Sequence, residues 1–109
     1  METRRDVFQA IADPTRRGIL TMLSKKPQNL NSIAEKFDMS RQAISLHVKI
    51  LSECGVININ QMGRERYCEL ELKKLNEVAD WLEPFRQLWE DRFNALDNII
   101  DKLKNEENE

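Results

Sequence analysis

Residues 40–51 have the sequence SRQAISLHVKIL, in which apolar and polar side chains recur with the period of an α-helix. Ile44, Val48 and Leu51 fall on one face, and the opposite face, apart from Leu46, is polar or basic and contains no carboxylate. Ser40 is a favourable N-cap, and Gly55 suits the position just beyond a helix that ends near residue 54. The segment therefore predicts a short amphipathic helix whose outer face can donate many hydrogen bonds.

Three further helices are predicted upstream of this segment. The first covers residues 4–12, and the second begins with Asp13 as its N-cap and Pro14 as its first residue, ending near residue 24. The third is short and covers residues 32–37. Only two residues then separate it from the helix that follows Ser40, a tight connection that suits helix-turn-helix geometry.

Downstream, residues 56–60 and 65–72 alternate between apolar and polar side chains around a turn at 62–64, which predicts a β-hairpin. From residue 73 the period is helical again, and Pro84 either kinks one helix or begins a second. Residues 105–109 are expected to be frayed. Nine apolar residues form a stripe at steps of three and four: Leu75, Val78, Leu82, Phe85, Trp89, Phe93, Leu96, Ile100 and Leu103.

This order of elements predicts a mainly α protein of the α+β kind. We expect a winged helix-turn-helix with a two-stranded hairpin wing and a long C-terminal dimerisation helix. Residues 1–75 would form the DNA-binding body, residues 76–104 the dimerisation helix and residues 105–109 the tail. At 109 residues the chain has room for one modest core.

Charge is divided unevenly along the chain, although the net charge is only −2. Residues 1–75 hold 13 Lys and Arg against 9 Asp and Glu, whereas residues 76–109 hold 4 against 10. A basic body of this kind can meet phosphate while the acidic end repels it. No apolar run approaches the roughly 18 residues of a membrane span, and no secretory signal follows Met1. We therefore expect a cytoplasmic protein, and the two cysteines fit a reducing compartment.

The outer face of residues 40–51 has the chemistry to read a DNA major groove. Gln42 can pair with adenine, Ser45 can reach a base or a phosphate, and Leu46 can lie against a thymine methyl. Basic side chains at the helix and at the hairpin tip would grip phosphates or enter a minor groove. The alternative is an ordinary solvated helix face and hairpin tip. The predicted DNA-binding residues are Ser40, Arg41, Gln42, Ser45, Leu46, His47, Lys49, Arg64 and Arg66.

Several segments, taken in order, resemble the arsenic-repressor (ArsR) family of winged-helix regulators, in the branch whose long tail lacks metal sites. The resemblance implies a symmetric dimer that represses transcription by covering its operator and that often controls its own operon. Leu46 departs from the polar residue usual in the family, so a base preference does not transfer. The similar segments are residues 12–20 (ADPTRRGIL), 40–51, 55–57 (GVI), 63–67 (GRERY), 81–85 (WLEPF) and 88–93 (LWEDRF), within about residues 4–104.

The C-terminal apolar stripe is larger than a body of about 75 residues can cover by itself. We expect part of it to pack on a second copy of the chain, although folding back onto its own core is the alternative. A two-fold dimer would present two reading helices about 34 Å apart to a pseudopalindromic operator. The predicted interface consists of Val7, Phe8, Ile11, Leu82, Phe85, Trp89, Phe93, Leu96 and Ile100.

Residue types for catalysis or metal binding are sparse. His47 and Cys54 are seven residues apart, roughly 10 Å along a helix, which is too far for one metal ion. We expect no enzyme, no metal and no cofactor, and the sequence names no effector. His47 is expected to pack or to contact phosphate. Pairing of Cys54 with Cys68, or a ligand cavity lined by aromatic residues of the tail, would give a redox- or ligand-responsive version of the same repressor. A winged-helix interaction module without DNA binding is the remaining alternative.

Overall fold

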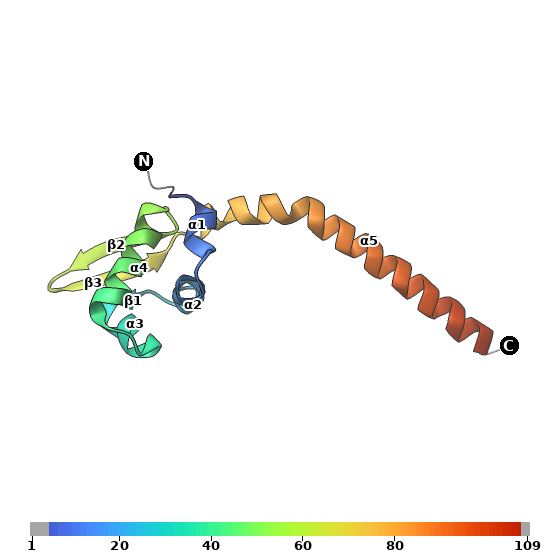
Figure 1. The fold of residues 1–109 in the computed structure, drawn as a ribbon, viewed down its shortest axis with the longest axis horizontal. Helices are drawn as coiled ribbons and strands as arrows, with labels where there is room; N and C mark the ends of the chain where they lie inside the picture. The colour runs from blue at the N-terminus through green and yellow to red at the C-terminus, as the bar shows by residue number, and fades with distance from the viewer. Residues whose placement is uncertain (1–4, 108–109) are drawn as a thin grey trace. The chain divides into compact units, whose positions relative to one another are not determined.

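The computed structural model describes residues 5–107, which form two compact units, one ending at Val78 and the other beginning at Ala79. The predicted order of helices and hairpin is confirmed (Figure 1). The elements are α1 (Val7–Ile11), α2 (Pro14–Leu23), β1 (Gln28–Asn29), α3 (Leu30–Phe37), α4 (Arg41–Glu53), β2 (Ile57–Met62), β3 (Glu65–Leu70), the 3₁₀-helix η1 (Leu72–Leu75) and α5 (Asn76–Glu107).

The starts of α2 and α4 lie where their capping residues predict. The Asp13 carboxylate accepts a hydrogen bond from the Arg16 amide at 3.1 Å, and the Ser40 hydroxyl accepts one from the Ala43 amide at 3.1 Å. Each cap satisfies an amide that has no partner within its helix. Between α3 and α4, Asp38 adopts a left-handed conformation with φ of 50°, which turns the chain sharply into the second helix of the motif.

The first and third helices differ from their predicted bounds because other residues cap them. Asp6 caps α1 by accepting from the Gln9 amide at 2.8 Å, so the helix begins at Val7; Arg4, which the prediction included, lies outside the described residues. Asn29 caps α3 by accepting from the Ser32 amide at 2.7 Å. The third helix therefore begins two residues earlier than its apolar pattern indicated.

The sheet has three strands rather than the two of the predicted hairpin. Its order is β1-β3-β2, and both pairings are antiparallel. The additional strand β1 has two residues, Gln28 and Asn29, which face Cys68 and Tyr67 of β3. Two polar residues are too few to show the alternation of apolar and polar side chains that predicts a strand, so this strand is recognised only from its pairing with β3. It ties the segment before α3 to the base of the hairpin, which projects from the helical body (Figure 1).

One apolar cluster joins the helices and the sheet of the first unit. Residues from α1 to β3 contribute to it, and the part of α5 that packs against it is Val78. The largest fully buried side chains are those of Val7, Ile19, Ile33, Ile44, Leu51, Val56 and Cys68.

Helix α5 runs without a break from Asn76 to Glu107, so Pro84 lies inside one helix and does not begin a second. Its last residues, 105–107, are helical although the sequence suggested fraying, since no glycine or proline lies between Pro84 and Glu107; residues 108–109 lie outside the described part. No residue of α5 is buried. Within residues 5–107, no helix combines the length and apolar character needed to cross a membrane.

The end of α4 is a Schellman motif built on Gly55, which has φ of +80°. The Gly55 amide donates to the Ser52 carbonyl at 3.0 Å, and the Val56 amide donates to the Leu51 carbonyl at 3.2 Å. Leu51 and Val56 are both fully buried and form the apolar part of the motif. The glycine therefore directs the chain from α4 into β2.

Replacing Gly55 with alanine should lower the free energy of unfolding by about 1–2 kcal/mol, because an L-residue is strained at this φ. The cost is one of backbone conformation, since an added Cβ would meet only Lys74 at an ordinary 3.7 Å. Urea unfolding followed by circular dichroism measures the change. Gly55→Asn is the matched control and should lose less, because asparagine tolerates this region better. Equal stability of Gly55→Ala and the parent chain would contradict the assignment.

Candidate nucleic-acid interface

Helix α4 is held by its inner face and exposes its outer face. Ile44 and Leu51 are fully buried and Val48 is 4% exposed. With these positions turned inward, the side chains of the opposite face point away from the core, and the one large apolar residue among them, Leu46, is 58% exposed. Ser45 and His47 are half-buried, and the exposed polar residues of the predicted set on α4 and its cap are Ser40, Arg41, Gln42 and Lys49.

The electrostatics of this helix favour an anion at its N-terminal end. Its first turn contains no acidic residue, and Arg41 and Gln42 occupy that turn. Amide groups at a helix N-terminus carry partial positive charge and bind phosphate readily. The start of α4 therefore offers both a cation and backbone donors to one phosphate.

The hairpin tip is a two-residue turn that presents arginine. Met62 and Glu65 are paired, so Gly63 and Arg64 form the turn, and Gly63 supplies the positive φ of 65° that it needs. The Gln61 amide group donates to the Gly63 carbonyl at 3.1 Å. These restraints hold Arg64 at the end of the projecting hairpin.

The structure brings three of the predicted arginines together. Arg41 of α4 and Arg64 and Arg66 of the hairpin line one small polar cavity of about 110 Å³. Glu65 also lines it, and the Tyr67 hydroxyl donates to the Glu65 carboxylate at 2.8 Å, an interaction that raises the pKa of Tyr67. The remaining polar residues that line this cavity were not predicted, because no sequence pattern links residues so far apart in the chain; they are Asn29, Asn31 and Gln61.

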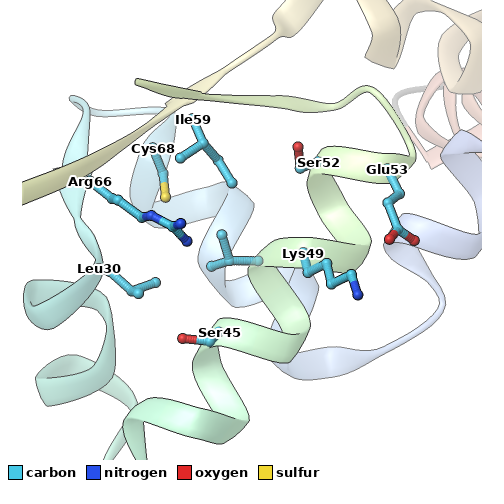
Figure 2. A pocket seen from close by; sticks show the side chains of 9 residues that line it. Leu30, Ser45, Lys49, Ser52, Glu53, Ile59, Arg66 and Cys68 are labelled. Carbon is cyan, nitrogen blue, oxygen red and sulfur yellow. The ribbon is translucent and has the colours of Figure 1, made fainter. Parts of the chain in front are cut away.

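A second cavity of about 290 Å³ lies between α4 and the sheet (Figure 2). Its apolar wall includes Val48 of α4 and Ile59 of β2, and Arg66 reaches over it from β3. Ser45 and Lys49, two predicted DNA contacts, also line it. Helix α4 and the hairpin therefore both line this cavity and both contribute to the apolar core. The other lining residues are Leu30, Ser52, Glu53 and Cys68.

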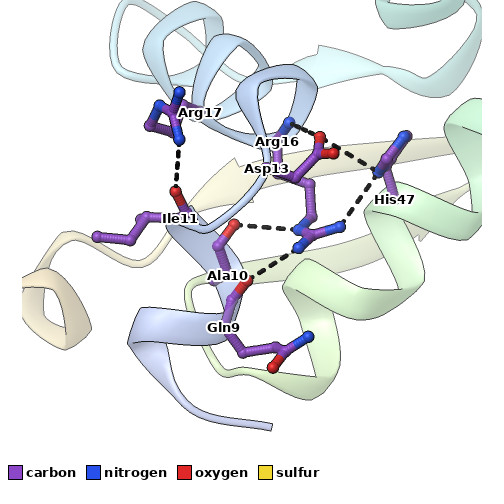
Figure 3. A network of polar contacts seen from close by, with 7 residues as sticks. All are labelled: Gln9, Ala10, Ile11, Asp13, Arg16, Arg17 and His47. Atoms are coloured by element: carbon purple, nitrogen blue, oxygen red, sulfur yellow. Dashed lines mark hydrogen bonds and ion pairs between the residues drawn. The ribbon is translucent and has the colours of Figure 1, made fainter.

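His47 differs from the other predicted contacts because its side chain turns back toward the body. It is only 18% exposed, and its Nδ1 lies 3.5 Å from the Arg16 guanidinium and 3.9 Å from the Asp13 carboxylate (Figure 3). The hydrogen bond that the Asp13 carboxylate accepts from the Arg16 amide lowers the pKa of Asp13, so this carboxylate is ionised at neutral pH. Direct contact between His47 and DNA stays a prediction.

Both cysteines are unpaired and buried, Cys54 at 2% exposure and Cys68 fully. Burial raises the pKa of each thiol, which disfavours the reactive thiolate. Neither thiol therefore has the exposure typical of a redox-sensing cysteine. Within residues 5–107 no group of three or more His, Cys, Asp or Glu side chains is arranged to hold a metal ion.

Comparison with known proteins agrees with this geometry. A helix-turn-helix domain family matches residues 11–60. The transcriptional repressor SdpR of Bacillus subtilis is 38% identical over 80 residues, which is 73% of this chain and 89% of SdpR. A crystal structure of an ArsR-family transcriptional regulator, RHA00566, has 38% identity and a TM-score of 0.68, covering 76% of this chain and 86% of that one. An ArsR-like regulator from Rhodococcus sp. RHA1 has 36% identity and a TM-score of 0.64, covering 85% and 88%.

The fold and the exposed basic helix define a winged helix-turn-helix protein that binds DNA and regulates transcription, not an enzyme. The chain belongs to the ArsR family of transcriptional regulators.

If the two thiols are buried as described, neither should react with Ellman's reagent at pH 7.5 within minutes, and both should react once urea unfolds the chain. DNA affinity should be the same before and after treatment with diamide, measured by gel shift. A rapid reaction of one thiol in the native protein, together with loss of DNA binding, would instead support the redox-responsive alternative.

Proposed function

We propose that the protein is a homodimeric, sequence-specific transcriptional repressor that controls its own operon. The observation that carries this proposal is the outer face of α4, which is exposed and free of carboxylates and lies beside the cavity lined by Arg41, Arg64 and Arg66. SdpR, the curated relative described above, is named a transcriptional repressor. We also propose that the protein works in the cytoplasm, where its DNA is.

The side chains of α4 divide into two roles by their chemistry. Gln42, Ser45 and Leu46 would read base edges, because amide, hydroxyl and apolar groups on a helix in the major groove reach them. Basic side chains and the helix N-terminus would hold the phosphates and set the register. The residues proposed for phosphate or minor-groove contact are Ser40, Arg41, Lys49, Arg64 and Arg66.

The proposed dimer interface is the apolar stripe of α5. Phe93 is 64% exposed and Trp89 63% exposed, whereas a soluble monomer rarely leaves so many large apolar groups uncovered on one helix. Val7, which the sequence placed at this interface, is fully buried in the core of its own chain, and the proposed interface omits it. It retains Phe8 and Ile11 of α1 and, from α5, Leu82, Phe85, Trp89, Phe93, Leu96 and Ile100.

A two-fold dimer would place two copies of α4 in successive major grooves about 34 Å apart on a pseudopalindromic operator. A protein bound there would cover promoter DNA and block transcription. The direct test is a gel shift with DNA from upstream of the protein's own gene, competed by the same DNA with its sequence scrambled. Retained specific complexes support the proposal, and equal competition by both DNAs overturns it.

Gln42→Ala should cost about 1–3 kcal/mol on the operator and relax base preference at one position in each half-site. Arg64→Ala should weaken binding to operator and scrambled DNA alike, and should lower the slope of log affinity against log salt by about one for each phosphate lost. Fluorescence anisotropy between 50 and 200 mM salt measures both effects. Identical losses on every sequence for the two variants would contradict this division of roles.

Phe93→Glu should convert the dimer into monomers, because it places a carboxylate in the middle of the apolar stripe. Sedimentation equilibrium measures the mass. The matched control is Asp91→Asn on the same helix, which is exposed and lies outside the stripe, and which should stay dimeric. A Phe93→Glu protein that sediments as a dimer would remove α5 from the interface.

A further inference from the structure

Arg16 is the only buried charged or polar residue that the structure records between residues 5 and 107, at 8% exposure. Its guanidinium Nη2 donates to the Gln9 carbonyl at 2.9 Å, and its Nε donates to the Ala10 carbonyl at 3.1 Å. These carbonyls lie at the C-terminal end of α1, where the last turn leaves carbonyl groups without the usual amide partner four residues on; the Gln9 carbonyl also accepts from the Ala12 amide at 3.3 Å. A guanidinium with five fixed donors can satisfy both and still point a further N–H elsewhere.

A further donor group of Arg16, Nη1, points at helix α4. Its Nη1 lies 3.5 Å from Nδ1 of His47, which is in the middle of α4 (Figure 3). If Nδ1 accepts this hydrogen bond, the ring is neutral and its proton is on Nε2. The Asp13 carboxylate, 3.9 Å from the same Nδ1, accepts a hydrogen bond from the Arg16 backbone amide and so caps α2. One buried cation therefore links the end of α1, the start of α2 and the middle of α4.

The rotation of α4 about its own axis determines which of its side chains would face DNA. Successive residues on a helix are about 100° apart, so holding His47 against the body also fixes the directions of Ser45, Leu46 and Gln42. The apolar inner face fixes which side of α4 faces the body, but its individual van der Waals contacts have no preferred direction. The polar contact between Arg16 and His47 does have one.

We propose that Arg16 and His47 are positioning residues for DNA recognition. Nδ1 of His47 anchors α4 to the guanidinium of Arg16, and the histidine acts on DNA through the neighbouring side chains of α4 and not by touching the duplex. This inference rests on the proposed function, in which α4 reads the operator. It assigns to His47 a different role from the direct contact expected from the sequence.

Two amide substitutions separate the positioning role from a direct contact. In His47→Asn the amide group comes near the position of Nδ1, whereas in His47→Gln it comes near that of Nε2. If Nδ1 is the working atom, His47→Asn should keep operator affinity within about three-fold. His47→Gln and His47→Ala should each lose about ten-fold on the operator, and less on scrambled DNA.

Salt dependence supplies a second readout. A positioning residue makes no phosphate contact, so the slope of log affinity against log salt should be the same in all three variants as in the parent chain. Thermal unfolding of each variant shows whether a loss of affinity comes from a loss of fold. Arg16→Lys is an additional variant, expected to lose operator discrimination because an ammonium group cannot bond both carbonyls of α1 and the imidazole together.

The tautomer of His47 can be observed without DNA. Nitrogen-15 shifts of the imidazole in the free protein should show the proton on Nε2. A proton on Nδ1 of the neutral ring would overturn the proposal, and so would full operator affinity in His47→Ala. Retained affinity in His47→Gln with loss in His47→Asn, and a salt slope lowered by about one, would instead assign His47 to a phosphate through Nε2. Failure of the parent chain to prefer its operator would overturn the proposed function as well, and is distinguishable because it needs no variant.

Discussion

The burial of the inner face of α4 is the constraint on which the other features of this regulator depend. Ile44 and Leu51 are fully buried, and they hold the helix against the helices and sheet of the first unit. Once these side chains are inside, helical geometry sends Gln42, Leu46 and Lys49 outward. The same core includes Val56 after the Schellman turn, so it also sets where the hairpin begins. The orientations of α4 and of the hairpin wing are therefore set by the same apolar core.

Polar contacts add directional restraints on the orientation of α4 to those of the apolar core. The buried guanidinium of Arg16 satisfies two carbonyls at the end of α1, and its third donor reaches α4 at His47. Breaking such a network leaves a buried charge without partners, which is costly, so the arrangement tends to be kept or lost as a unit. The second unit lacks a core of its own, because no residue of α5 is buried. Its exposed apolar stripe is the surface that the proposed dimer would cover.

Local signals in the sequence were sufficient for much of this fold. The starts of α2 and α4 follow from Asp13, Pro14 and Ser40, since each cap supplies an acceptor to an amide of its own helix. Features of the fold that depend on distant residues could not be predicted from the sequence. Strand β1 exists because Gln28 lies opposite Cys68, forty positions away, and the continuity of α5 through Pro84 has no local marker.

Helical period, capping residues and charge are properties of neighbours in the chain, so they were enough to indicate the class of protein and the chemistry of the outer face of α4. Which distant residues meet depended on the tertiary structure. It brought Arg41 together with Arg64 and Arg66, placed Val7 in the core, and turned His47 toward Arg16, thirty-one positions earlier in the chain. Such contacts depend on how the elements pack against one another, and packing is a property of the whole folded chain.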